Sequence, residues 1–398
     1  MLQRSKPLPI QLIFISLLSF IMNPILGIFI TSIIIINKVS LSFSFKLLFL
    51  FISTYLALIV TTKSQESDLL HYADIFFNSK NHSLISYLNF YGKEFIFFMM
   101  SYFSYYVFDG NFDLYIILFM LCIYLSIYRG IYSVYFNKIP FFLLLLLVFY
   151  VSSLRGIFFA SHHLIRQILA FSIVIYFIST RYYTKPKYYL LLIAFFVHTS
   201  SISIILISLL PKINKLFSIK FFLYFISACA LLYSTNNFIL LNIENIPFLG
   251  YITNRIFDVD SLFNSSFESL TFFEHVTSFV FLALALYLTL FNKKFPKQSY
   301  ILNTYILYFI LTYVFLLVLD NEFLFIRNYL NFSLFYPFII GSLLSYIYIS
   351  RFKLAYVFYV LFFLLIFVQY ILFFRSIEDQ DYDAVFELIL NSVFHFLY

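Results

Sequence analysis

Side chains that can handle a phosphate group gather between two apolar stretches of the sequence. Arg155 comes first, and the run His162-His163-Leu-Ile-Arg166-Gln167 follows. A guanidinium holds phosphate with a planar two-pronged fork, and a histidine exchanges protons near neutral pH. Ionisable groups at membrane depth usually line a cavity or a substrate path. The alternative is that both arginines reach up to lipid headgroups while the histidines lie in a wet loop.

Carboxylates and tyrosines form a second cluster upstream. Asp68 and Tyr72 are four residues apart, so a helix would place them on one face. Glu94 follows the run Tyr91-Gly92-Lys93. Such groups can bind sugar hydroxyls or act as a general base. An ordinary solvated loop explains the cluster equally well.

Two more polar sites interrupt apolar sequence. The run His-Thr-Ser-Ser at 198–201 breaks the segment 188–210, and His198 can serve either as a base or as a structural residue that caps its turn. Arg327 follows Asp-Asn-Glu at 320–322. It can hold phosphate, or it can pair with Glu322.

The sequence contains no recognisable metal or nucleotide motif. His162 and His163 are adjacent rather than four residues apart, and Cys122 and Cys229 both lie inside apolar runs. No P-loop or other glycine-rich fingerprint occurs. Alternating acids at 379–383 are typical of a solvated tail. We therefore expect no metal, no cofactor and no nucleotide-driven chemistry.

The composition predicts the elements that position these residues. Of the 398 residues, 63% are hydrophobic and only 11% are charged, so the net charge of +7 does not indicate a nucleic-acid partner. Apolar runs long enough for membrane helices recur throughout. We predict an all-α, polytopic integral membrane helix bundle, one domain over 1–398 with about 11–13 hydrophobic segments. The segments are expected at 10–22, 24–36, 41–60, 94–108, 111–128, 140–152, 164–180, 188–210, 219–234, 271–291, 299–319, 328–350 and 354–374.

The charges predict an orientation. Seven acid-free clusters hold 17 of the 25 basic residues, and all 18 acids lie in the other connections. The positive-inside rule places these clusters, and with them the N-terminus, in the cytoplasm. All seven histidines then lie at the outer face or at the turn around His198. The segment 188–210 must enter and return, 94–108 is a re-entrant or surface helix, and 10–36 is a hairpin. Extracytoplasmic connections follow near 61–93, 153–165, 235–270, 320–327 and in the tail 375–398.

Several of these motifs together resemble a known family. Arg155, the run His-Leu-Ile-Arg-Gln-Ile-Leu-Ala at 163–170, the basic turn 181–187 and the run Leu-Ile-Ala-Phe-Phe-Val-His-Thr-Ser-Ser at 192–201 are similar to the EpsG-like branch of the Wzy-type bacterial O-antigen polymerases. Asp68, Tyr72 and Glu94 resemble that family's Asp-x-x-x-Tyr and following Glu, and 327–329 resembles it weakly. Phe95-Ile96 departs from it, because relatives often have Pro and a nearby Gly there.

The resemblance implies a glycosyltransferase of the GT-C kind. Such enzymes move a glycan from one undecaprenyl diphosphate carrier to the sugar end of another lipid-linked unit, at the outer face of the bacterial inner membrane. The donor is already activated, so neither ATP nor a sugar nucleotide is needed. The implied partners are this lipid-linked oligosaccharide, membrane lipid and a chain-length regulator protein. The substrate-binding candidates are Arg155, Arg166, Gln167, Arg327 and Tyr72, and the unranked catalytic candidates are Asp68, Glu94, His163 and His198.

Two other functions are consistent with a polar membrane site. A flippase or transporter of lipid-linked oligosaccharide would spread ionisable groups through both leaflets, often with internal repeats. Here the cytoplasmic halves of the segments are nearly free of them. A membrane acyltransferase would need a catalytic histidine and a cytoplasmic acyl donor, which the outward position of the histidines disfavours.

Overall fold

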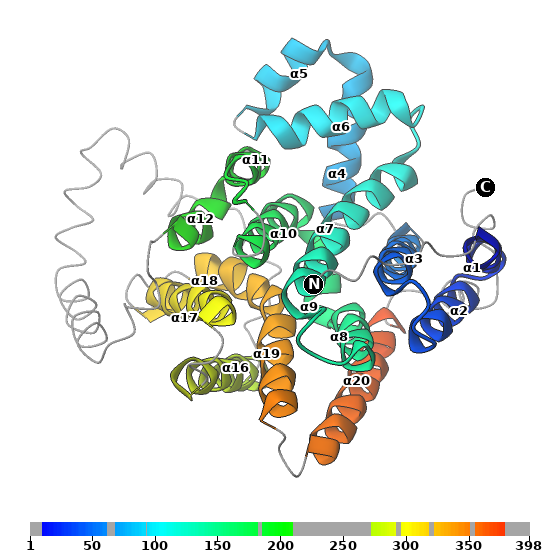
Figure 1. The fold of residues 1–398 in the computed structure, drawn as a ribbon. Coiled ribbons are helices and arrows are strands. Elements are labelled where there is room, and N and C mark those ends of the chain that lie inside the picture. Colours follow the sequence, from blue (N-terminus) through cyan, green and yellow to red (C-terminus); the bar gives the residue numbers. More distant parts are fainter. Residues whose placement is uncertain are drawn as a thin grey trace. The chain divides into compact units, whose positions relative to one another are not determined.

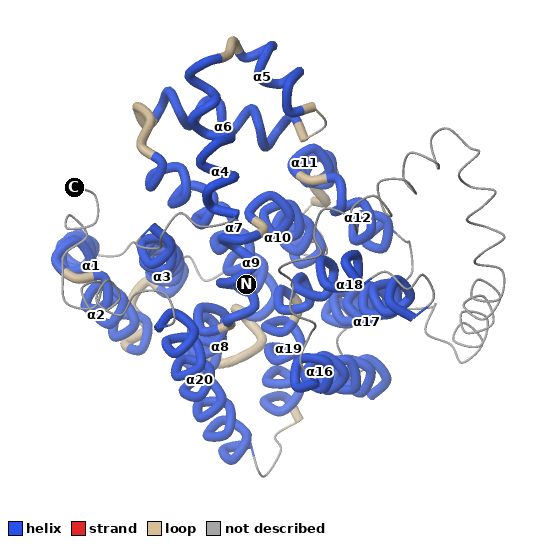
Figure 2. Tube along the Cα trace, turned by 180° about the vertical axis from the view of Figure 1, so that it is seen from behind, coloured by secondary structure: helices blue, strands red, loops and turns tan. Residues whose placement is uncertain are grey.

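In the computed structural model of the chain, every regular element of the described residues is a helix (Figures 1 and 2). This confirms the predicted all-α membrane bundle. The chain divides into two compact units, each described here by itself: unit 1 is Met1–Ile205 with Ile340–Tyr398, and unit 2 is Leu206–Ile339. The single-domain assignment stays a prediction. The structure describes residues 10–61, 68–92, 94–181, 185–209, 272–291, 296–317, 322–350 and 355–378.

Unit 1 contains most of the helices. They are α1 (Ile10–Met22), α2 (Pro24–Ile36), α3 (Leu41–Thr61), α4 (Asp68–Phe77), η1 (Asn78–Asn81), α5 (Leu84–Tyr91), α6 (Phe95–Val107), α7 (Phe112–Tyr135), α8 (Phe141–Ser153), α9 (Arg155–His163), α10 (Ile165–Thr180), α11 (Tyr189–Val197), η2 (Thr199–Ser201) and α20 (Ala355–Glu378). Two more helices cross the boundary between the units: α12 (Ile202–Leu209) and α19 (Tyr336–Ile349).

The first two helices form a tight pair. Asn23 separates them with extended backbone, and its side chain accepts a hydrogen bond from the Leu26 amide at 3.0 Å, which caps α2. A Cβ atom on Gly27 would lie only 2.5 Å from the Phe20 Cα. Glycine therefore lets the two backbones approach, as a hairpin over 10–36 requires.

Helix α7 lies at the centre of unit 1, where it contacts both α3 and α10. Asn111 starts it by accepting a hydrogen bond from the Leu114 amide at 3.0 Å. Its buried face carries several fully buried tyrosines, and one of them, Tyr135, shares a 2.9 Å hydrogen bond with Ser342. This packing provides the rigid support against which α10 is held.

Residues 153–165, expected as a connection between helices, are instead mostly helix α9. The chain bends by 48° between α8 and α9, at Leu154. The hydroxyl of Ser153 bonds back to the Tyr150 carbonyl at 2.9 Å, and such bonds compete with the helical ladder. A second break at Leu164 begins α10. The sequence did not indicate the intervening turns of helix because its polar residues resemble those of a loop.

The expected connection 61–93 is also largely helical. Tyr87 of α5 donates a 2.7 Å hydrogen bond to the Ile75 carbonyl of α4, and Asn78 donates one of 2.9 Å to the Tyr91 hydroxyl. Gly92, with a φ of 79°, ends α5 in a conformation that glycine adopts without strain. These contacts explain why polar sequence forms ordered helices here. Glu94 lies two residues after Gly92.

The described part of unit 2 contains α16 (Phe272–Phe291), α17 (Pro296–Leu317), α18 (Glu322–Tyr329) and η4 (Leu330–Leu334), together with the ends of α12 and α19. Helix α17 packs against both α16 and α18. The Tyr308 hydroxyl donates a 2.7 Å hydrogen bond to the Asn328 side chain, which joins α17 to α18.

Three described helices are long and apolar enough to cross a membrane: Leu41–Thr61, Phe112–Tyr135 and Leu330–Ile349. The bent pair α8–α9 brings the number to four if it forms one span. Eight further apolar helices of 10–17 residues accompany them. This pattern matches an integral membrane protein with several segments too short to cross alone.

Candidate functional site

Glu94 occupies the turn between α5 and α6. Its backbone stands at the N-cap position of α6, yet its side chain makes no capping hydrogen bond. The residue is only 8% exposed. A buried carboxylate that does not cap its own helix needs other partners, because an unpaired buried charge is costly.

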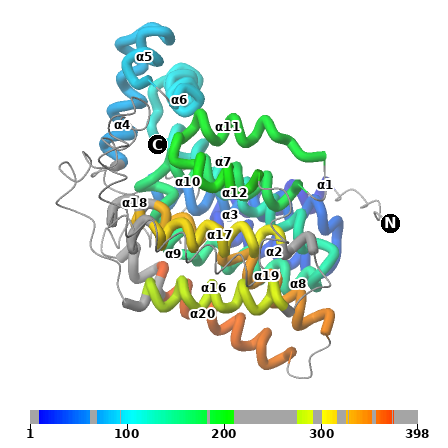
Figure 3. The backbone as a smooth tube through the Cα atoms, turned by 90° about the vertical axis from the view of Figure 1, so that its left-hand side faces the viewer, coloured from blue at the N-terminus to red at the C-terminus, as the bar shows by residue number. Residues whose placement is uncertain are grey.

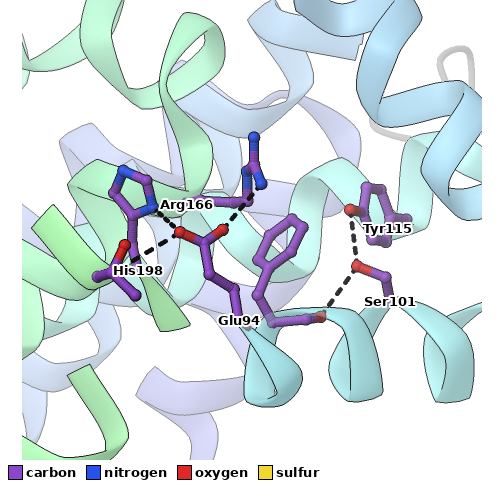
Figure 4. A network of polar contacts seen from close by, with 7 residues as sticks. Glu94, Ser101, Tyr115, Arg166 and His198 are labelled. Atoms are coloured by element: carbon purple, nitrogen blue, oxygen red, sulfur yellow. Dashed lines mark hydrogen bonds and ion pairs between the residues drawn. The ribbon is translucent and has the colours of Figure 1, made fainter. Parts of the chain in front are cut away.

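The partners of Glu94 are an arginine and a histidine from distant parts of the sequence. Oε2 accepts a hydrogen bond from Arg166 Nη1 at 2.8 Å. Oε1 accepts a hydrogen bond from His198 Nδ1 and a longer one, of 3.4 Å, from the Thr199 amide. Figure 4 shows the carboxylate between the two side chains. One carboxylate thus joins the start of α10 to the turn after α11.

Aromatic rings hold the Arg166 guanidinium from other directions. Its Cζ atom lies 5.7 Å from the centre of the Phe97 ring, 5.8 Å from that of Phe98 and 6.0 Å from that of Tyr72. The Tyr72 hydroxyl also interacts with the guanidinium. Rings at such distances attract a cation through their negative faces. Arg166 is therefore fixed in position, while 26% of its side chain stays exposed.

His198 is positioned by a break in the helical backbone. Its extended conformation, with φ −156° and ψ 124°, ends α11, and Figure 3 shows the chain turning back after this helix. An ionised carboxylate only accepts hydrogen bonds, so Nδ1 must carry the proton in the contact with Glu94. The opposite nitrogen, Nε2, is then the atom that can take up a proton from another molecule.

The surroundings of Glu94 favour its charged form. Burial by itself raises the pKa of this carboxyl. The hydrogen bond from His198, the electrostatic attraction of His198 and Arg166, and the Thr199 amide outweigh burial and hold the pKa below its ordinary value. Glu94 is therefore ionised at neutral pH and acts as a hydrogen-bond acceptor rather than an acid.

Four of the nine candidate site residues meet here: Tyr72, Glu94, Arg166 and His198. The other candidates of unit 1 whose side chains are described lie on α9 and α10, close to Arg166 in the sequence. Arg155 is exposed at the start of α9, and Gln167 is buried directly after Arg166. His163 ends α9 with its ring 4.1 Å from that of Phe159. Their roles stay predictions.

The side chains of Asp68 and Arg327 lie outside the described residues. Asp68 is the first residue of α4, one helical turn before Tyr72, as its spacing predicted. Arg327 belongs to α18 in unit 2. Neither residue is placed relative to the Glu94 carboxylate.

Sequence reasoning missed several residues around the site. Phe97 and Phe98 stand three and four residues after Glu94, a spacing that places them on its side of α6, but they read as plain apolar sequence. The Thr199 amide carries no side-chain signal. Beside the site, Ser101 and the fully buried Tyr115 share a 3.0 Å hydrogen bond (Figure 4). Within the described ranges, no group of three His, Cys, Asp or Glu residues could hold a metal.

In this helical membrane protein, the buried carboxylate that Arg166 and His198 share defines the candidate site. Residues 46–387 match the model of the EpsG family. The chain therefore belongs to the EpsG family, a family of glycosyltransferase-like polysaccharide polymerases, which confirms the resemblance in its motifs. The matched range includes Tyr72, Glu94, Arg166 and His198. No curated protein matches the chain, and no solved structure does.

Proposed function

We propose that this protein polymerises lipid-linked oligosaccharide repeat units. It transfers a glycan from undecaprenyl diphosphate to the sugar end of a second lipid-linked unit at the outer face of the bacterial inner membrane. One observation carries the proposal: the Glu94 carboxylate holds both Arg166 and His198. A cation for the leaving diphosphate and a base for the incoming hydroxyl are thereby kept at a constant separation.

The reaction assigns each group a step. The acceptor hydroxyl oxygen forms a bond to the anomeric carbon of the donor glycan, while the bond from that carbon to the diphosphate oxygen breaks. The hydroxyl proton goes to His198 Nε2, and the bond's electron pair leaves with the diphosphate. Glu94 stabilises the imidazolium that forms, and Arg166 stabilises the charge of the departing diphosphate. No outside reagent is required.

Arg166 keeps the capacity to bind phosphate while it is paired. A guanidinium carries five N–H donors, and the described contact with Glu94 engages Nη1. The exposed quarter of its side chain leaves room for a ligand. Gln167 and Arg155 are proposed to contribute further contacts, because a diphosphate carries more charge than one arginine neutralises.

Purified full-length protein in liposomes, given only lipid-diphosphate-linked repeat units, tests the proposal. We expect glycan chains to lengthen as a ladder on a gel, without nucleotide and in the presence of EDTA. Strict dependence on a divalent metal would overturn the metal-independent mechanism. Movement of the intact lipid-linked unit between leaflets with no growth of the glycan would show a flippase instead.

A further inference from the structure

Unit 2 contains a second histidine that is held by a hydroxyl network, at a place where α16, α17 and α18 meet. His275 Nδ1 lies 3.1 Å from the Tyr313 hydroxyl, which lies 3.1 Å from the Ser278 hydroxyl. The imidazole stacks on the Phe325 ring, with centroids 5.6 Å apart and planes 9° from parallel. Three helices thus fix the position and the plane of one imidazole.

Counting the protons of this network determines the tautomer of His275. Ser278 donates its single hydroxyl proton to the His275 carbonyl at 2.8 Å. The bond between Ser278 and Tyr313 must then use the proton of Tyr313. With that proton occupied, the bond between Tyr313 and His275 requires the proton of Nδ1. His275 Nε2 is consequently an unprotonated acceptor when the ring is neutral.

This acceptor is open to a ligand. Within the described residues, Tyr313 is the one hydrogen-bond partner of the His275 side chain. The Nε2 atom of His275 is not fully buried. The residue as a whole is half-buried. An accessible, bare ring nitrogen accepts a hydrogen bond from a neutral hydroxyl, whereas it repels the lone pairs of an anion.

The surroundings of the acceptor are aromatic. The centroid of the Tyr329 ring lies 6.3 Å from that of His275, and Tyr313 contacts the Phe325 ring at 5.1 Å. The ring of Phe279, a residue that is 49% exposed, lies 5.1 Å from the Tyr313 ring. Apolar walls with one precisely oriented polar group are typical of binding sites for neutral small molecules. A sugar combines hydroxyl donors with apolar C–H faces that pack on aromatic rings.

We propose that His275, Tyr313 and Phe325 form a sugar-binding site in unit 2, in which His275 Nε2 accepts a hydrogen bond from a glycan hydroxyl. This inference rests on the proposed function, because a polymerase must bind both a donor glycan and an acceptor glycan. It adds a glycan contact that lies outside the Glu94 site. The site is made for the neutral sugar part of the substrate and not for its diphosphate.

The full-length protein in detergent micelles tests this with lipid-free oligosaccharides, released by mild acid from the polysaccharide of the producing cell. Saturation-transfer NMR reports which sugar protons approach the protein. We expect binding by the wild type, and binding about tenfold weaker in His275→Ala and in Tyr313→Phe, as the loss of one well-made hydrogen bond predicts. Tyr313→Phe keeps the ring and so covers the case in which His275→Ala fails to fold.

His82→Ala is the matched control. The His82 ring also stacks on a phenylalanine, Phe90, with centroids 5.8 Å apart, and its Nδ1 also lies near a hydroxyl, that of Ser86 at 3.3 Å. Its substitution is expected to leave oligosaccharide binding unchanged. Binding that is equal in wild type, folded His275→Ala and Tyr313→Phe would overturn the proposal, and so would a wild type that binds no oligosaccharide.

The Glu94→Gln variant separates this inference from the proposed function. We expect it to bind the oligosaccharide as the wild type does, while it elongates chains far more slowly. Chain growth by a wild type whose His275 variants bind sugar normally would refute the sugar site alone. Oligosaccharide binding that depends on His275, in a wild-type protein that elongates nothing, would refute the polymerase reaction alone.

Discussion

Glu94 and Arg166 are separated by 72 residues in the sequence, and their side chains meet at 2.8 Å. Both side chains are largely buried, at 11% and 26% exposed respectively. The same carboxylate reaches His198 through its other oxygen. The ion pair therefore joins the α4–α6 segment to α10 and to the turn after α11, and its loss would affect structure as well as chemistry.

Glu94→Gln is expected to destabilise the protein at neutral pH. Removing one partner of a buried ion pair leaves the other charge uncompensated, at a cost of about 3 kcal/mol. The thermal unfolding midpoint in detergent measures this. Asp113→Asn, in the first turn of α7, is the control, with an expected change of less than about 1 kcal/mol.

The difference in stability between the wild type and Glu94→Gln is expected to depend on pH, because the pKa of Glu94 is lowered in the folded protein. A carboxyl group whose pKa is lower in the folded than in the unfolded state stabilises the fold fully above its unfolded pKa. This contribution disappears as the pH falls through the folded pKa. The midpoints of wild type and Glu94→Gln are therefore expected to converge in acid. A difference that stays constant with pH would show that Glu94 contributes by packing alone.

Arg166→Lys is expected to lower the rate of chain growth about 100-fold, although the positive charge remains. An ammonium cannot bond Glu94 and a diphosphate oxygen with a planar fork at the same time. The rate of ladder formation in liposomes measures the effect. Arg181→Lys is the matched control, because Arg181 ends the same helix and also lies over an aromatic ring, that of Phe177. Equal rates in wild type and Arg166→Lys would show that the guanidinium fork of Arg166 is not needed for chain growth.

His198→Gln is expected to slow chain growth by about 10²–10⁴-fold, the usual contribution of a general base. Glutamine can still donate a hydrogen bond to Glu94, so folding and donor binding are expected to survive. The double variant with Glu94→Gln is expected to be little slower than the slower single variant, because the two groups act as one unit. Rates that multiply would indicate that Glu94 and His198 act independently.

The orientation is tested by cysteine labelling in a background without Cys122 and Cys229. We expect a membrane-impermeant reagent added outside to label position 198 but neither 185 nor 215, because basic clusters flank 188–210 on both sides. His198 and Lys185 lie in the described chain, and Lys215 lies outside it. Labelling at 185 and not at 198 would reverse the orientation.

The sequence by itself determined the class of this protein. Its apolar content leaves a lipid environment as the only one compatible with folding. In the described part of the chain, most of the predicted apolar runs form helices of 13 to 24 residues. The motifs around Glu94, Arg166 and His198 also identified the family, and all three residues were candidates. These properties depend on local pattern and on residue type, which a single chain displays directly.

The tertiary structure decided which candidates act together. Spacing placed Asp68 and Tyr72 on one helix, but no local pattern says that Glu94 meets a side chain 104 residues away. Such contacts arise because a buried carboxylate must find donors wherever the packing of α6, α10 and α11 brings them. The break at Leu154 likewise lies beside the Ser153 hydroxyl, which bonds to the Tyr150 carbonyl. For the same reason the sequence alone did not separate Glu94 and its partners from the equally polar Arg155 and His163.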